Sequence, residues 1–226
     1  MHILRRVRDG RSGIGGELGY FGLGTWWVCT FSPTERQYME AAFVTPEMPQ
    51  GARPLTRDRG LVNIQATAVL LAALGERLGD KPQDRPLASR VLAKAEDRAL
   101  AENDILGLYL TYHQMIRLHS KWKDDFADAA DLAFAACHKQ MRLAPQAAAA
   151  FREKYPEKPL PAHLGYLQAA TMLEQQGAYA PAIEICRQAE SEGWNGNWSW
   201  RIHRMAKKLA ERSPLRPISP SGIGPV

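Results

Sequence analysis

The sequence predicts an all-α fold, built from antiparallel helix hairpins and closed by a C-terminal amphipathic helix. Between residues 60 and 212, apolar residues recur at steps of three and four, which is typical of one buried face of a helix. Gly177 divides residues 160–193 into two such runs, as a left-handed residue between two helices would. The final run, residues 197–212, places apolar residues on one face and cations on another.

Length and composition favour one helical body with short ends. The chain has 226 residues, of which 45% are hydrophobic, enough for a substantial core. We expect residues 1–19 to be a flexible, basic and glycine-rich arm, residues 20–212 to form a single all-α domain, and residues 213–226 to be a disordered proline-rich tail.

Aromatic and apolar side chains follow the arm directly. We expect this segment to dock as a plug against the helical body through Phe21, Leu23, Trp26 and Trp27. Next, Ser32 and Glu35 have the spacing of a capping box, and Pro33 suits the first position of a helix. The sequence therefore predicts a short helix over residues 33–43, followed by a loop over residues 44–59.

Four longer helices are predicted before residue 145. The first runs from Gly60 to Leu78, and its wide apolar stripe indicates that it is buried on most sides. The others are predicted from about Asp84 to Leu100, from a cap at Asn103 to Ser120, and from the acidic pair Asp124–Asp125 to Leu143, where Pro145 should stop the helix.

The hairpin of residues 160–193 shows the most specific pattern in the chain. Its first helix carries Tyr166, Ala169, Ala170 and Leu173 before the turn, and its second carries Tyr179, Ala182, Cys186 and Ala189. This pattern resembles a tetratricopeptide repeat (TPR) of about 34 residues, in which small residues let two helices approach closely. Trp194 stands where the family usually has proline. The resemblance implies a short TPR-like array of three hairpins, about residues 60–100, 103–144 and 161–193.

The last predicted helix is suited to end such an array. Trp198, Ile202, Met205 and Leu209 share one face, and cations occupy another. Such a helix can cover the final hairpin and present charge to water, as a terminal cap requires. The three tryptophans of residues 194–200 should include one or two core anchors and one partly exposed ring.

Charge and reactive side chains give little indication of catalysis. The net charge of +5 comes from the ends, since residues 1–12 contribute +3, residues 201–226 contribute +5, and the remainder is −3. Three scattered cysteines form no metal-binding pair, and we expect Cys137 and Cys186 to be buried thiols. No nucleophile or histidine motif is present, so we expect no enzymatic activity, no metal and no cofactor.

Two functions remain open. In the first, the protein is a scaffold or adaptor that holds a peptide or helix of another protein in a TPR-like groove, with the lining residues guessed as Tyr109, Tyr112, His113, Tyr166 and Gln168. In the second, nucleic acid or another polyanion binds the N-terminal arm and the basic last helix through Arg201, Arg204, Lys207, Lys208 and Arg212. No apolar run is long enough to span a membrane, and we expect a cytoplasmic protein.

Overall fold

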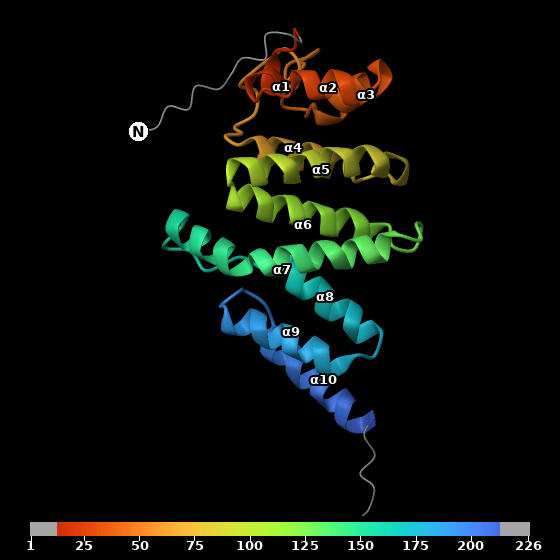
Figure 1. Ribbon diagram of the computed structural model, residues 1–226, viewed down its shortest axis with the longest axis vertical. Coiled ribbons are helices and arrows are strands. Elements are labelled where there is room, and N and C mark those ends of the chain that lie inside the picture. Colours follow the sequence, from red (N-terminus) through yellow and green to blue (C-terminus); the bar gives the residue numbers. More distant parts are fainter. Residues whose placement is uncertain (1–12, 213–226) are drawn as a thin grey trace, which may run out of the picture. The chain divides into compact units, whose positions relative to one another are not determined.

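Apart from one isolated bridge between Ala162 and Asn195, the regular secondary structure of residues 13–212 is helical (Figure 1). These are the residues that the computed structural model describes, and the all-α prediction is confirmed for them. Their helices are α1 (Gly16–Tyr20), α2 (Gly24–Thr30), α3 (Pro33–Phe43), α4 (Thr67–Leu78), the 3₁₀ helix η1 (Pro82–Asp84), α5 (Arg85–Glu102), α6 (Ile105–Lys121), α7 (Ala129–Lys154), α8 (Leu164–Gln175), α9 (Tyr179–Ser191) and α10 (Trp198–Arg212). The expected proline-rich tail, residues 213–226, lies outside the described residues, as do residues 1–12 of the expected arm.

The chain divides into two compact units, whereas the sequence led us to expect a single domain over residues 20–212. The first unit ends at Glu157 and the second begins at Lys158. In the first unit, α4 packs on α5, both pack on α6, and α6 packs on α7, so these helices lie as successive layers (Figure 1). In the second unit, α9 packs between α8 and α10.

The start of the first unit differs from the expected flexible arm, because residues 16–20 form α1. The first amides of α1 have partners in the loop that follows α3: the N–H groups of Gly15, Glu17 and Leu18 donate to the carbonyls of Thr56, Pro54 and Leu55, each at 2.9 Å. Gly16 has φ +58°, and a Cβ there would lie 2.6 Å from the Leu55 carbonyl carbon. The glycines of this segment thus permit a close backbone contact.

Two buried carboxylates also hold the same loop. Glu40 of α3 accepts hydrogen bonds from the Leu55 N–H (2.8 Å) and the Thr56 hydroxyl (2.6 Å). Glu17 of α1 accepts one from the Gly60 N–H at 2.8 Å. Both carboxylates are buried, and Leu55 is fully buried between these contacts. This loop without helix is therefore fixed by side-chain acceptors in addition to its backbone hydrogen bonds with α1.

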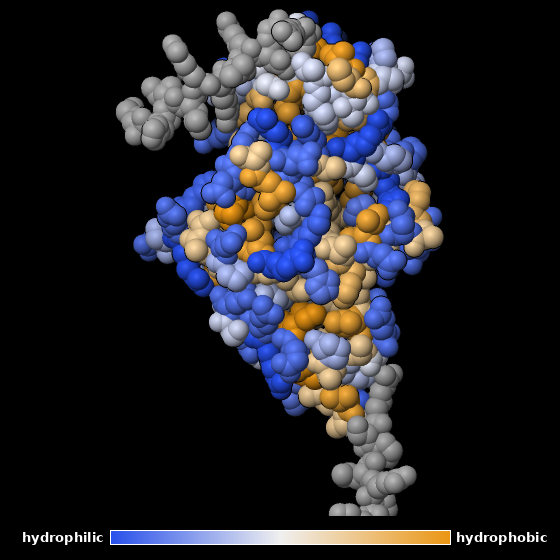
Figure 2. All heavy atoms as spheres, in the orientation of Figure 1, coloured by the Kyte–Doolittle hydropathy of each residue, from blue (hydrophilic) through white to orange (hydrophobic). Residues whose placement is uncertain are grey.

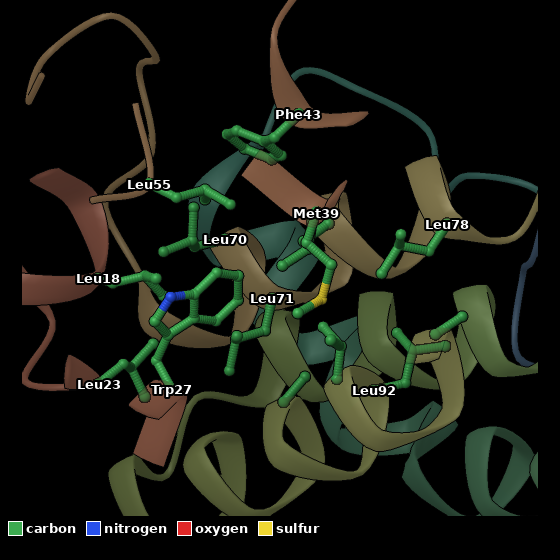
Figure 3. Packing of buried hydrophobic residues seen from close by; sticks show 14 of the residues in the cluster. Leu18, Leu23, Trp27, Met39, Phe43, Leu55, Leu70, Leu71, Leu78 and Leu92 are labelled. Carbon is green, nitrogen blue, oxygen red and sulfur yellow. The ribbon is translucent and has the colours of Figure 1, made fainter. Parts of the chain in front are cut away.

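The plug predicted for residues 21–27 is present in the core. Trp27 is 1% exposed and gathers with Leu18 and Leu23 against Leu70 and Leu71 of α4 (Figure 3). Phe21 is also buried, and Trp26 packs against the same cluster. The apolar side chains of α1 to α3 thereby cover the face of α4 that α5 and α6 leave open.

Several predicted helix ends are confirmed and others are wrong. The capping box of α3 is formed, with the Glu35 N–H donating to the Ser32 hydroxyl and the Ser32 N–H donating to the Glu35 carboxylate. The helix predicted from Gly60 begins at Thr67 instead. Asn103 does not cap α6; it ends α5 in the left-handed region with φ 52°, and Asp104 caps α6 by accepting from the Gly107 N–H at 2.9 Å.

Pro145 does not end a helix, contrary to the prediction. α7 begins at Ala129 and continues through Pro145 to Lys154. Proline inside a helix costs about 3 kcal/mol, since it removes one hydrogen bond and crowds the preceding turn. Here Pro145 is exposed, while Leu143, Ala144, Ala147 and Ala148 on the opposite face are buried. Packing of the buried face offsets the free-energy cost of placing Pro145 inside the helix.

The second unit follows the predicted hairpin closely. Gly177 has φ 76° and ends α8, with the Ala178 N–H donating to the Leu173 carbonyl at 2.9 Å. Alanine and cysteine side chains fill the contact between α8 and α9, and all are fully buried: Ala169, Ala170, Ala182, Cys186 and Ala189. Burial is confirmed for Cys137 as well, whereas Cys29 is exposed.

Removing the Glu40 carboxylate should loosen the N-terminal helices. Glu40→Ala leaves the Leu55 N–H and the Thr56 hydroxyl without their acceptor, and we expect a loss of about 2–4 kcal/mol in the free energy of unfolding. Glu40→Gln keeps one acceptor oxygen and should lose less than half of that. Urea unfolding followed by circular dichroism measures both values, and equal losses in the two variants would contradict this account.

His119 should make the first unit sensitive to acid. Its ring is buried on α6, with Nδ1 3.4 Å from Nη2 of Arg85, and burial together with the Arg85 charge lowers the pKa of His119 to about 4, against a smaller opposing effect of Asp128. In the unfolded chain the pKa of His119 is near 6.5, the ordinary value for histidine. The contribution of neutral His119 to the free energy of unfolding is therefore fully present above pH 6.5 and falls as the pH drops towards 4.

Between pH 7 and pH 5 the wild-type protein should lose about 2 kcal/mol more than His119→Gln, in which this titration is absent. Urea titrations at the two pH values give the comparison. His203→Gln, at an exposed position of α10, is the matched control and should behave like the wild-type protein. If the wild-type protein and His119→Gln lose the same stability, His119 is not the titrating group.

Candidate partner-binding site

The three tyrosines guessed as groove residues are core residues. Tyr109 and Tyr112 of α6 are each 6% exposed, and Tyr166 of α8 is fully buried. The Tyr109 ring packs edge-on against Phe151 with centroids 5.2 Å apart. The hydroxyls of Tyr112 and Tyr166 donate to Glu96 and Glu192, each at 2.9 Å. Burial raises the pKa of all three phenols, and none of their rings can line an open groove.

The other two guessed groove residues are half-buried. His113 lies on α6 of the first unit, where burial and the nearby Arg117 lower its pKa while Glu76 opposes them. Gln168 lies on α8 of the second unit. The five guessed residues thus belong to two separate units, and only His113 and Gln168 keep part of their side chains at a surface.

Three cations of the guessed polyanion site on α10, Arg201, Arg204 and Lys208, have anionic or polar partners in the second unit. Nζ of Lys208 lies 3.0 Å from Oε1 of Glu174, and Arg204 forms an ion pair with the same carboxylate. Burial would raise the pKa of Glu174, but the Lys208 hydrogen bond and the Arg204 charge together bring it below its usual value. One carboxylate on α8 therefore offsets two of the cations.

The remaining members of that set differ from one another. Nη1 of Arg201 donates to the Thr171 hydroxyl at 3.3 Å, and Lys207 is exposed. Arg212 ends α10, but its side chain lies outside the described residues, as do the N-terminal arginines of residues 1–12. The positive charge of the described part of α10 is consequently offset in part by Glu174, which the sequence of the helix alone does not show.

A hollow at the start of α10 was not anticipated from the sequence. It has a volume of about 330 Å³, and its lining residues are Ala162, His163, Leu167, Asn195, Gly196, Asn197, Trp198, Trp200 and Arg201. The Ala162–Asn195 bridge and a hydrogen bond from the Asn195 N–H to the Pro161 carbonyl (3.3 Å) connect the segments before α8 and α10. The hollow is therefore built on backbone contacts of the second unit.

Two buried tryptophans fix the wall of this hollow. The indole N–H of Trp198 donates to the Trp194 carbonyl at 2.7 Å, and that of Trp194 donates to Glu192 at 2.9 Å. A Cβ at Gly196 would lie 2.5 Å from the Trp198 ring, so the turn before α10 needs glycine. Both rings are almost fully buried, as expected for core anchors.

Trp200 is the exposed ring of the three. Two residues along a helix turn its side chain by about 200° from that of Trp198, and its exposed fraction is 59%. The guanidinium of Arg204 lies 4.5 Å from the Trp200 ring centre, which stabilises the ring in place. The exposure of one ring was expected from the sequence, although its place beside a hollow was not.

The lining of the hollow combines apolar and polar side chains. Trp200 and Leu167 offer apolar contact, while Arg201 and the two asparagine amides offer donors to carbonyl or carboxylate oxygens. Within residues 13–212, no cluster of three or more His, Cys, Asp and Glu side chains could hold a metal ion. Burial raises the pKa of the Cys186 thiol, which disfavours the reactive thiolate.

Apolar side chains also reach the surface over the second unit. Figure 2 shows them among hydrophilic ones on α8 to α10, and the large exposed ones there include Trp200 and Leu209, which is 37% exposed. None of the described helices is both long and apolar enough to cross a membrane.

Comparison with protein-family models, with curated proteins and with solved structures finds no match to this chain.

Proposed function

We propose that this protein is a non-enzymatic interaction module of TPR-like helix hairpins, which binds a peptide or helix of a partner protein at the Trp200 hollow. The observation that carries the proposal is the exposed ring of Trp200, held by Arg204 at the mouth of a hollow whose walls are fixed by Trp194 and Trp198. Exposed aromatic side chains on rigid supports are frequent anchors of protein interfaces.

The helix packing supports the TPR-like part of the proposal. In the first unit, α6 packs on both α4 and α5, and α7 packs on α6, so successive helices form layers as stacked hairpins do. In the second unit, Tyr166, Ala170, Ala182 and Ala189 are buried at the positions where the repeat pattern places its small and aromatic residues. α10 then covers α9 as a terminal cap would.

The chemistry of the hollow favours a polypeptide partner. An apolar side chain of the partner would cover Trp200, and its backbone carbonyls or an acidic side chain would accept from Arg201 and the amides of Asn195 and Asn197. Polyanion binding through α10 receives less support, because Glu174 already pairs with Arg204 and Lys208. Phosphate oxygens would compete with that carboxylate for the same cations.

Truncating Trp200 should abolish most of the binding. The full chain is used to select binders from a displayed random-peptide library, and the selected peptides are titrated by calorimetry. We expect Trp200→Ala to weaken them about 30-fold, on the order of 2 kcal/mol. Lys207→Ala, an exposed change on the same helix, should stay within about threefold. Circular dichroism of both variants verifies that the fold is retained.

Two results would overturn the proposal. Selected peptides that bind Trp200→Ala as tightly as the wild-type chain would show that the hollow is not the site. Retention of single-stranded RNA that weakens steeply between 50 and 200 mM salt, together with failure to select any peptide, would favour the polyanion alternative.

A further inference from the structure

A second concave site lies in the first unit, far from the Trp200 hollow in sequence. It is a cleft of about 800 Å³ between α3 and the loop that Glu17 and Glu40 hold. Its lining residues are Ile14, Trp27, Pro33, Arg36, Gln37, Glu40, Ala41, Val44, Gly51, Ala52, Arg53 and Thr56. This volume is in the range of small-molecule sites in proteins.

Apolar side chains form much of the cleft wall. Trp27 contributes from α2, Ala41 from α3, and Val44 and Ala52 from the loop. Trp27 is packed in the core and supports the wall from behind, while Ala41 and Val44 provide its accessible apolar surface. A rigid apolar wall of this kind fits the hydrocarbon part of a ligand.

The one carboxylate of the cleft already has two hydrogen bonds. Glu40 is 6% exposed, and its two oxygens accept from the Leu55 N–H and the Thr56 hydroxyl. Its orientation is fixed by the loop, so it is poorly placed to turn towards a cationic ligand. The cleft therefore does not select for cations through Glu40.

The two arginines of the cleft have no salt bridge with any residue from 13 to 212. Nη1 of Arg36 donates to the carbonyls of Val28 and Phe31 at 3.0 and 2.7 Å, which holds this guanidinium at the end of α2. Arg53 is exposed on the loop. The Asp58 carboxylate lies close to Arg53 and accepts from its backbone N–H at 2.7 Å, but it forms no salt bridge with the Arg53 guanidinium. Two cations beside an apolar wall are complementary to an anion with an apolar tail.

We propose that this cleft binds a small amphipathic carboxylate, with its hydrocarbon part against Ala41 and Val44 and its carboxylate at Arg36 and Arg53. The charge argues against residues 1–12 as the occupant, because that segment contains four arginines and one aspartate. The site is separate from the partner-binding hollow, and the inference does not depend on the proposed function.

Dodecanoate below its micellar concentration is the probe, titrated into the full chain by calorimetry. Dodecyltrimethylammonium, of the same tail length and opposite charge, is the matched ligand control and should bind at least tenfold more weakly. Arg53→Gln should weaken dodecanoate about tenfold, since it removes one charged hydrogen-bond donor. The Arg53 side chain makes no hydrogen bond that the fold of residues 13–212 requires, so this variant should keep its structure.

A bulky side chain in the cleft gives an independent test. Ala41→Trp should abolish dodecanoate binding by filling the space beside Val44. Ala180→Trp, at an exposed alanine of α9 in the second unit, is the matched control and should bind as the wild-type chain does. Equal binding of the two dodecyl ligands, or unchanged binding by Ala41→Trp, would overturn the inference.

Discussion

The hydrogen bonds that Glu17 and Glu40 accept from the loop after α3 are the interaction on which the first unit depends. Without them, the buried amide of Leu55 would have no acceptor, Gly60 would lose its contact with Glu17, and α1 would lose the loop carbonyls that hold its first turn. The loop also places Leu55 in the hydrophobic core, where it packs with side chains of the N-terminal helices. The same carboxylate, Glu40, also lines the cleft, so the residue that fixes the loop contributes to the site as well.

Local signals explain which helix ends could be predicted. The capping box of Ser32 and Glu35 and the left-handed Gly177 act within a few residues, and both are as the sequence indicates. α1 could not be predicted, because its amides bond to residues about 40 positions further along the chain. Pro145 was misread for a similar reason: burial of the alanines around it outweighs a local penalty that the sequence shows plainly.

The candidate site was predictable only in part. Aromatic residues at helical spacing in α6 and α8 indicate a core face as readily as a groove. Because Tyr109 and Tyr166 are buried, these residues form a core face. Exposure of one tryptophan near residue 200 could be inferred, because Trp198 and Trp200 cannot lie on the same helix face. The hollow beside it depends on the Ala162–Asn195 bridge, a contact between distant residues that no spacing rule indicates.

Cations illustrate why a basic segment is a poor guide to a binding surface. The basic helix α10 attracted attention in the sequence, yet Glu174, some 30 residues earlier, pairs with two of its cations. Arg36 and Arg53 stand apart in sequence with no basic run around them, and neither has a salt bridge to the described residues. An arginine can attract an anionic ligand to the extent that its charge is not already offset within the fold. By that criterion, among the described residues the cleft at α3 is a better candidate for an anionic ligand than α10 is, and we propose that α10 contributes an aromatic anchor in its place.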